Sequence, residues 1–167
     1  MTETTGSTPS PRKQGSAERV RSYLEAHGLS EAIFTFDRST KTAQMAADAM
    51  GCELGQIVKS LVFVVDDRPV LALVAGDRRG DTAAIAGLLG GKKASFADAD
   101  TVRTATGYAI GGVSPFDLPG ELTVLVDDSL ERFDVVYPAA GTPSSMVRMT
   151  RGQLLAVTGG RVERIAQ

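Results

Sequence analysis

The chain alternates between segments with the period of a helix and apolar runs with the length of a strand. Two such runs, 57–65 and 70–77, are joined by DDRP and predict a β-hairpin of largely buried strands. Further strands are predicted at 32–36, 92–96, 122–127, 133–139, 145–149 and 161–165. Helices are predicted at 16–27, 40–51, 81–91, 98–107 and 151–160. Several strands follow one another too closely for crossover helices, so the sheet of this α/β (α+β) chain is predicted to be mixed.

The length of 167 residues is that of one domain. Residues 1–15 are rich in Thr, Ser, Pro and Gly and are predicted to be a disordered tail. Residues 16–167 are predicted to form a single domain. Ser16 is a plausible N-cap for the first helix, and a Thr in 40–42 begins the second.

The balance of charges limits the partners. Eighteen Lys and Arg residues stand against 20 Asp and Glu, and the net charge is −2. A protein that grips long duplex nucleic acid through its phosphates usually has a basic excess. We therefore expect no DNA partner, and any contact with RNA is expected to be local.

One cysteine and one histidine restrict the chemistry further. An intrachain disulfide is impossible, which favours a reducing compartment. Zinc sites usually need several Cys or His ligands, so neither a metal nor a cofactor is expected. A Cys52–His27 dyad stays open, although His27 fits the end of a helix better. The chain shows no apolar leader or 18-residue apolar run, so it is expected to be soluble and cytoplasmic, with no membrane partner.

Lys59 is an ammonium group set inside a strand-like apolar run, GQIVKSLVFVV. One interpretation places it on the solvent side of the strand, with its amine reaching outward. The other starts from its apolar neighbours, which indicate a sheet covered on both faces. A lysine there would point into a cavity, where it could meet a phosphate or polarise a carbonyl.

Two glycine-containing turns supply the other polar features. In GYAIGGVSPF, Gly111 and Gly112 allow close approach of a ligand, and their N–H groups can form an anion-binding nest. An ordinary tight turn between helix and strand is the alternative. In GTPSS, three hydroxyl groups are candidate hydrogen-bond donors: Thr142, Ser144 and Ser145. GLLGGKKA lacks the P-loop spacing, and GGVSPF lacks the dinucleotide fingerprint.

Together these segments resemble the YbaK family, the editing domain also inserted in bacterial prolyl-tRNA synthetases. The resemblance spans about residues 17–166 and is carried by QIVKSLVF, DTAAIAGLLGGKKASFADAD, TGYAIGGVSP and AGTP. It implies a compact fold with a barrel-like mixed sheet and flanking helices. It also implies hydrolysis of mischarged aminoacyl-tRNA, a translation-fidelity activity directed at tRNA(Pro)-type substrates with a small amino acid such as Ala or Cys.

The resemblance maps the family's lysine onto Lys59, its GxxxP loop onto Gly111 through Pro115, and its later turn onto Gly141 and Pro143. From this mapping and from the charges of the chain we expect the following roles. Lys59 would hold the 3′-terminal phosphate or the ester carbonyl, and the amides of Gly111 and Gly112 would polarise that carbonyl. The substrate-binding set is Val113, Ser114, Pro115, Gly141, Thr142, Pro143 and Ser144. Candidate phosphate contacts, each otherwise a solvated surface charge, are Arg78, Arg79, Lys92, Lys93, Arg148 and Arg151. Many similar proteins carry a histidine after GTP, where this chain has Ser144 and Ser145.

Two other classes of function stay open. The chain could be a non-catalytic module that binds a tRNA end or a small amino-acid-like ligand, because holding an ester carbonyl and hydrolysing it need similar donors. It could also dock on a synthetase. The expected partner is the tRNA acceptor end, with an aminoacyl-tRNA synthetase as a second candidate, and the oligomeric state is left open.

Overall fold

A computed structural model describes residues 15–29 and 33–167. The predicted tail falls almost wholly outside these residues. The helices are α1 (Ser16–Ala26), α2 (Ala43–Met50), α3 (Thr82–Leu88), α4 (Ala99–Thr106) and α5 (Arg151–Thr158), with 3₁₀ turns η3 (Leu54–Gln56) and η4 (Asp128–Arg132). The strands are β1 (Ile33–Thr35), β2 (Ile57–Val65), β3 (Arg68–Ala75), β4 (Ala94–Phe96), β5 (Thr123–Asp127), β6 (Val135–Pro138), β7 (Ser145–Val147), β8 (Met149–Thr150) and β9 (Arg161–Glu163).

Side-chain caps fix most helix starts. Asp81 and Asp98 accept the N–H groups three residues on, at 3.1 and 2.8 Å. Thr42 caps α2, so this helix begins at Ala43 rather than at residue 40. The prediction that Ser16 caps α1 is wrong: Ser16 is already helical, and Gly15 precedes it without a side-chain cap.

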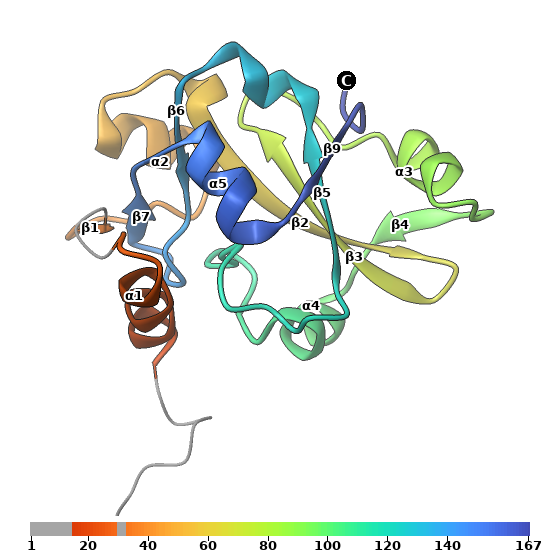
Figure 1. The fold of residues 1–167 in the computed structure, drawn as a ribbon, viewed down its shortest axis with the longest axis horizontal. Coiled ribbons are helices and arrows are strands. Elements are labelled where there is room, and N and C mark those ends of the chain that lie inside the picture. Colours follow the sequence, from red (N-terminus) through yellow and green to blue (C-terminus); the bar gives the residue numbers. More distant parts are fainter. Residues whose placement is uncertain (1–14, 30–32) are drawn as a thin grey trace, which may run out of the picture.

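The main sheet is mixed, as predicted, with strand order β8-β6-β2-β3-β5-β9 and β4 also paired with β2. β2 and β3 are antiparallel, whereas β2–β6, β3–β5 and β5–β9 are parallel. β1 and β7 form a separate two-stranded sheet. Figure 1 shows the long β2–β3 ribbon crossing the molecule, with α5 in front of it, α4 below and α3 beside β4.

The β2–β3 turn is shorter than predicted. Asp66 and Asp67 both have positive φ, 47° and 72°, and form a two-residue turn of the kind that suits the twist of a hairpin. β3 therefore begins at Arg68 instead of residue 70. The Asp66 carboxylate accepts the main-chain N–H groups of Lys92 and Lys93 and so joins the hairpin tip to the segment after α3.

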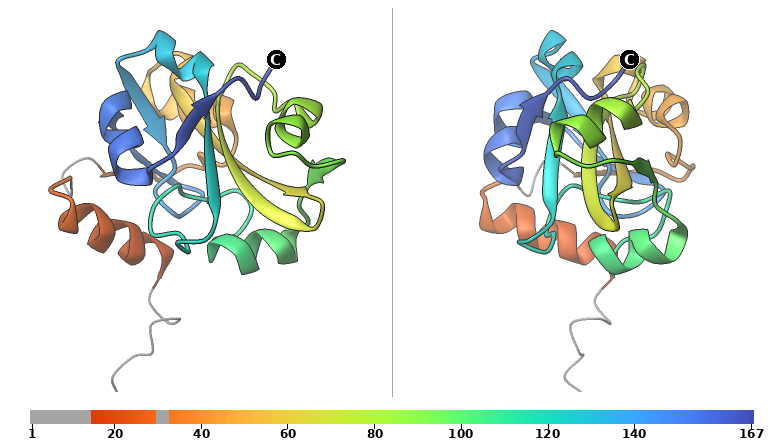
Figure 2. Two further views of the ribbon diagram at one scale, coloured as in Figure 1. Left: turned by 45° about the vertical axis from the view of Figure 1, so that its right-hand side comes forward. Right: turned by 90° about the vertical axis from the view of Figure 1, so that its right-hand side faces the viewer.

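Apolar side chains cover β2 on both faces. Val58 and Val62 belong to the larger core cluster, whereas Phe63 and Val65 belong to a second cluster beneath α3. The turned views show the sheet curling, with helices distributed around it (Figure 2). The curled, half-barrel sheet agrees with the predicted barrel-like fold. None of the described helices is long and apolar enough to cross a membrane.

The outer edge of β2 is interrupted. β6 pairs with Ile57 and Val58, and β4 pairs with 63–65. Among the described strands, none pairs with 59–61 on that side. This gap places the middle of β2 beside a cavity.

Candidate active site

The cavity at the gap in the sheet has a volume of about 610 Å³. This is enough for a small ligand or the end of a larger one. It is lined by Thr40, Lys41, Thr42, Ala43, Ala46, Ile57, Val58, Lys59, Ser60, Leu61, Val62, Phe96, Ala97, Val102, Ile110, Gly111, Val113, Ala139 and Met146. The predicted lysine, the predicted glycine loop and the second helix therefore meet at one place.

Lys59 lines this cavity and is half-buried. Its ammonium donates a hydrogen bond to the main-chain carbonyl of Arg78, in the turn after β3. Burial lowers the pKa of Lys59 below its ordinary value of 10.5; Asp77 opposes this shift, and Arg79 adds to it. The amine is thus held by one carbonyl and retains donors for a ligand.

Asp77 steadies the turn that holds Lys59. Its carboxylate forms two hydrogen bonds with the Arg132 guanidinium, at 2.9 and 2.7 Å. The hydrogen bonding by Arg132 lowers the pKa of Asp77, so this residue is anionic at neutral pH. Arg132 also bonds the carbonyl of Ser129, which links the turn to η4.

Ser60 adds main-chain groups to the cavity. The Ile57 carbonyl bonds Gly76 on the β3 side, whereas the Val62 carbonyl bonds Ala97 on the opposite side. Because backbone groups alternate along a strand, the N–H and C=O of Ser60 point into the gap. The cavity therefore has a main-chain donor next to the lysine.

The glycine loop forms another part of the wall. Gly111 and Val113 line the cavity, and Gly111 has φ +95°, a conformation that favours glycine. Gly112 packs on the 142–143 turn: a Cβ there would lie 3.1 Å from the Thr142 carbonyl carbon. Ser114 and Pro115 are buried behind the loop.

Arg19 of α1 clamps the ends of this loop. Its guanidinium donates to the carbonyls of Gly107 and Asp117, at 3.2 and 2.7 Å, and lies 4.4 Å from the centre of the Tyr108 ring. The Tyr108 hydroxyl donates to the Phe116 carbonyl at 2.5 Å. Burial raises the pKa of Tyr108 to about 12, so this hydroxyl keeps its proton. The loop is therefore held in shape before a ligand arrives.

The predicted GTPSS turn supports the loop without lining the cavity. Gly141 has φ +94° and is packed against α1, where a Cβ would meet the Ser16 carbonyl at 2.8 Å. The Thr142 and Ser145 hydroxyls bond each other at 2.6 Å. The main chain of Pro143 accepts from the Thr40 N–H, which connects this turn to the approach of α2.

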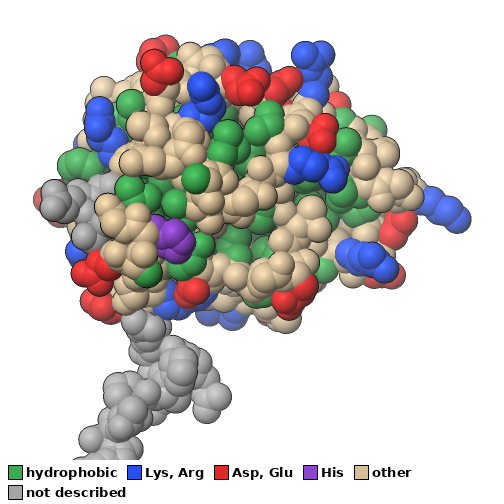
Figure 3. Space-filling model, viewed as in Figure 1, with side chains coloured by type: hydrophobic (Ala, Val, Ile, Leu, Met, Phe, Trp, Pro, Cys, Tyr) green, Lys and Arg blue, Asp and Glu red, His purple; other side chains and the backbone are tan. Residues whose placement is uncertain are grey.

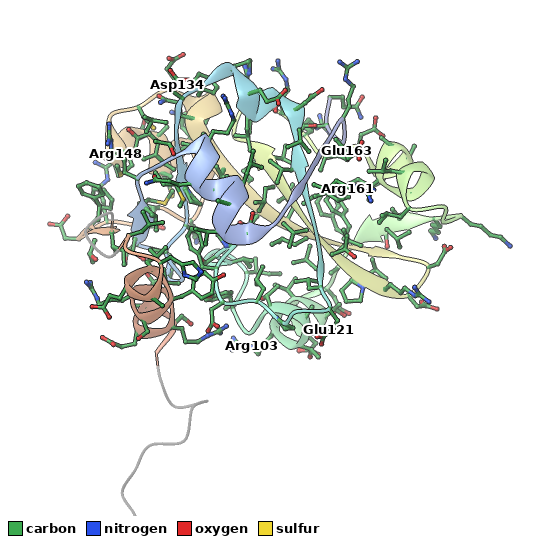
Figure 4. All side chains as sticks on the ribbon, in the orientation of Figure 1. Arg103, Glu121, Asp134, Arg148, Arg161 and Glu163 are labelled. Carbon is green, nitrogen blue, oxygen red and sulfur yellow. The ribbon has the colours of Figure 1, made fainter. Side chains whose placement is uncertain are left out.

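The six predicted phosphate contacts lie outside the cavity wall. Arg78 pairs with Asp77 at 3.6 Å, and Arg151 donates to the carbonyls of Glu131 and Phe133, which gives it a structural role. Arg148 is exposed on the β7 side of the molecule (Figure 4). The main chains of the other three are tied elsewhere: Arg79 to Gln167, and Lys92 and Lys93 to Asp66.

Several lining residues have no distinctive signal in the sequence. Lys41, Phe96 and Ile110 come from three separate segments, and only the fold brings them together. Thr40 and Ser60 also reach the wall, and their hydroxyl oxygens are buried with no hydrogen-bond partner in the part of the chain that the structure describes. Lys41 lies beside the loop, because its Cβ is 3.5 Å from the place a Gly111 Cβ would take.

Other sites are less suited to chemistry. A cavity of about 750 Å³ near the hairpin tip includes Asp66, Arg68 and Glu121 but none of the residues predicted for catalysis. His27 and Cys52 do not line the smaller cavity, and burial raises the pKa of the Cys52 thiol. No group of three His, Cys, Asp or Glu side chains within 15–29 and 33–167 could hold a metal ion.

Several known proteins are similar to this chain in sequence and in fold. The family model for the aminoacyl-tRNA editing domain matches residues 37–157. A crystal structure described as a candidate trans-editing enzyme for prolyl tRNA synthetase is 40% identical, with a TM-score of 0.81, and the match covers 96% of this chain and 99% of that one.

Two relatives with names that specify a reaction are also similar. The multifunctional Ser/Thr-tRNA deacylase ProXp-y of Escherichia coli is 29% identical, over 84% of this chain and 86% of its own length. The candidate Cys-tRNA(Pro)/Cys-tRNA(Cys) deacylase EbsC of Enterococcus faecalis is 25% identical, over 79% and 81%. The enzyme class is that of the aminoacyl-tRNA deacylases, and the chain belongs to the aminoacyl-tRNA editing domain family.

Proposed function

We propose that the chain hydrolyses, in trans, the ester bond of a mischarged aminoacyl-tRNA that carries a small amino acid, with tRNA(Pro) as the first candidate. The observation that carries this proposal is the meeting of a half-buried cation, Lys59, with the Gly111 loop at one cavity. Both are donors suited to an ester carbonyl, and they come from segments about fifty residues apart.

The chemistry requires little from the side chains. The ester bond between an amino acid and the tRNA ribose is activated by the α-ammonium and by the neighbouring hydroxyl. Lys59, the main-chain N–H of Ser60 and the amide of Gly111 would stabilise the oxyanion that forms when a water, positioned by the neighbouring ribose hydroxyl, attacks the carbonyl; the ester oxygen then leaves with the ribose, takes up a proton, and the amino acid is released. One such donor is worth about 10²–10³ in rate. Proton transfer by a histidine is therefore unnecessary. The predicted Gly112 donor is already satisfied, because its N–H donates to the Ala109 carbonyl at 3.0 Å.

The apolar part of the cavity wall favours a substrate whose amino acid has a small side chain. Ala43 and Ala46 of α2 and Ala139 after β6 present methyl groups to the cavity. A wall of this kind excludes large side chains by contact, but it separates similar small ones weakly. Alanine and cysteine remain the proposed substrates, and serine and threonine join the panel because of the relative ProXp-y.

The test is deacylation of a panel of aminoacyl-tRNAs: alanyl-, cysteinyl-, seryl- and threonyl-tRNA, each mischarged on tRNA(Pro) and, for comparison, correctly charged on its cognate tRNA. We expect hydrolysis of at least one ester at enzyme concentrations far below that of the substrate. Lys59→Met should lower kcat/KM by at least about 100-fold, because it removes the charge but keeps the aliphatic stem. Arg161→Ala on β9 is the matched control.

Two results would replace this proposal. Binding of charged tRNA without loss of any ester would indicate a non-catalytic binding module. Hydrolysis that needs an added synthetase would indicate a docking partner. Full activity of Lys59→Met would remove Lys59 from the mechanism while leaving the deacylase assignment in place.

A further inference from the structure

Two exposed apolar side chains lie at the mouth of the candidate cavity. Phe96 is 64% exposed and Ile110 is 62% exposed, the two highest values among the large hydrophobic residues that the structure describes. Both line the cavity, although they come from β4 and from the glycine loop. Scattered exposed apolar residues are ordinary, but a pair at one mouth indicates a contact with a ligand.

Phe96 is fixed in place from one side. It pairs with Phe63 in the β2–β4 register, and the two ring centres are 4.6 Å apart with an angle of 39° between their planes. Phe63 is fully buried, so Phe96 covers a core residue with one part of its ring. The rest of the ring is free to stack on a flat partner.

The other side of the mouth is aliphatic and cationic. Ile110 directly precedes Gly111, the loop residue that lines the cavity. Lys41 lies against Gly111 and is exposed. A ligand that leaves the cavity past Gly111 therefore meets an aromatic ring, an aliphatic side chain and an ammonium group.

We propose that Phe96 stacks on the base of the terminal nucleotide of the tRNA, with Ile110 contacting the same nucleotide and Lys41 its phosphate. This inference rests on the proposed function. In the substrate the ester carbonyl is bonded to the ribose of that nucleotide. A carbonyl held at Lys59 and Gly111 therefore leaves the ribose and its base at the mouth. Every base has a π face, so this contact is independent of the amino acid.

The first experiment compares Phe96→Ala, Phe96→Leu and Phe96→Tyr in deacylation of one preferred mischarged tRNA. Loss of base stacking is expected to raise KM by about 5- to 150-fold in the alanine variant, with a smaller change in kcat. Tyrosine keeps the ring and should retain a near wild-type KM. In Phe96→Leu the leucine still covers Phe63, so the core beneath it stays covered. A raised KM in this variant would therefore come from the loss of stacking and not from a folding defect.

The matched control is Phe34→Ala. Phe34 is another exposed phenylalanine, 41% exposed, in β1, and it does not line the cavity. Its removal should leave KM unchanged. Melting temperatures of all variants show whether each protein is folded at the assay temperature.

The second experiment needs no catalysis. An uncharged acceptor-stem RNA carries 2-aminopurine in place of its terminal adenine, and the emission of this base falls when it stacks. Binding to the wild type and to Phe96→Tyr should quench the emission, whereas Phe96→Ala should bind more weakly and give little quenching at saturation. Anisotropy of the same RNA, labelled at its 5′ end, gives the bound fraction.

The outcomes separate the two proposals. Deacylation with an unchanged KM in Phe96→Ala, together with full quenching, would overturn the stacking role and leave the proposed function standing. Quenching that depends on Phe96, without hydrolysis of any ester, would support the stacking contact and overturn the proposed function. Self-association that is lost in Phe96→Ala, with no effect on RNA, would assign this surface to a second copy of the chain and overturn the inference.

Discussion

At the scale of single residues, the half-buried position of Lys59 disfavours its charged form. Burial lowers its pKa from the ordinary 10.5. We predict that the ¹³Cε resonance of Lys59 titrates with a midpoint below the ordinary lysine value of 10.5, as measured by NMR and assigned with Lys59→Met. A midpoint at or above 10.5 would contradict the described burial.

The lowered pKa of Lys59 also determines how its contribution to the free energy of unfolding changes with pH. Between the lowered pKa and about 10.5, the unfolded chain binds more protons at Lys59 than the folded chain. The contribution of this residue to the free energy of unfolding therefore rises with pH through that window. Because the cation is the form proposed to bind the ester carbonyl, activity should fall over the same range in which this contribution grows.

Gly112 supports a prediction about the shape of the loop. Its φ is not positive, but a Cβ would lie 3.1–3.3 Å from backbone atoms of Thr142 and Pro143. Gly112→Ala should therefore push the loop away from that turn and lower kcat/KM by about tenfold or more, since small misplacements of catalytic groups are costly. Deacylation kinetics provide the measurement.

The control for that substitution is Gly87→Ala in α3, where an added Cβ meets nothing within 4 Å. It should leave activity unchanged and stabilise the protein by about 1 kcal/mol, because alanine is the better helix former. Equal activity of Gly112→Ala and Gly87→Ala would mean that the loop position tolerates a side chain.

At the scale of elements, the sequence predicts what depends on local pattern. The run 57–65 is a strand with the predicted bounds, and α3, α4 and α5 lie within the predicted ranges 81–91, 98–107 and 151–160, each after a side-chain cap. The sequence pattern does not predict the two 3₁₀ turns, which are three and five residues long, or the two-residue form of the hairpin turn.

The residues of the candidate site also fall into two groups: those that the sequence singles out and those that only the fold places at the cavity. Lys59, Gly111 and Val113 stand in recognisable segments, and all three line the cavity. Phe96 and Ile110 also lie in segments that carry the resemblance, and Lys41 lies in a predicted helix, but no pattern in the sequence selects these three side chains. Only the fold brings them to one mouth.

The clamp between α1 and the glycine loop is another contact that no local pattern encodes. Arg19 bonds the carbonyls of Gly107 and Asp117 and stacks on Tyr108. Arg19→Met should increase amide exchange across 107–112 and lower kcat/KM by about tenfold, because the loop loses its fixed shape. Hydrogen exchange read by mass spectrometry is the measurement. Arg21→Met, an exposed change on the same helix, should alter neither quantity.

At the scale of the whole molecule, the distribution of charge determines how the protein meets RNA. The net charge is −2, and the face in Figure 3 carries Lys, Arg, Asp and Glu side chains interspersed. Among the residues that the structure describes, two cations line the cavity, Lys41 and Lys59. A single-stranded end that contacts both would release few counterions, since each neutralised phosphate adds about 0.7 to the salt slope.

We therefore predict a weak salt dependence for binding of an uncharged acceptor-stem RNA. The slope of log Kd against log salt concentration should be no more than about 1.4, and Lys41→Gln should lower it by about 0.7. Arg161→Ala should leave it unchanged, because Arg161 does not line the cavity and pairs with Glu163 at 2.9 Å on β9, three positions from β2 in the sheet order. A slope near 5 would mean that the RNA lies along a surface far larger than this mouth, and the six predicted phosphate contacts would then become the residues to substitute.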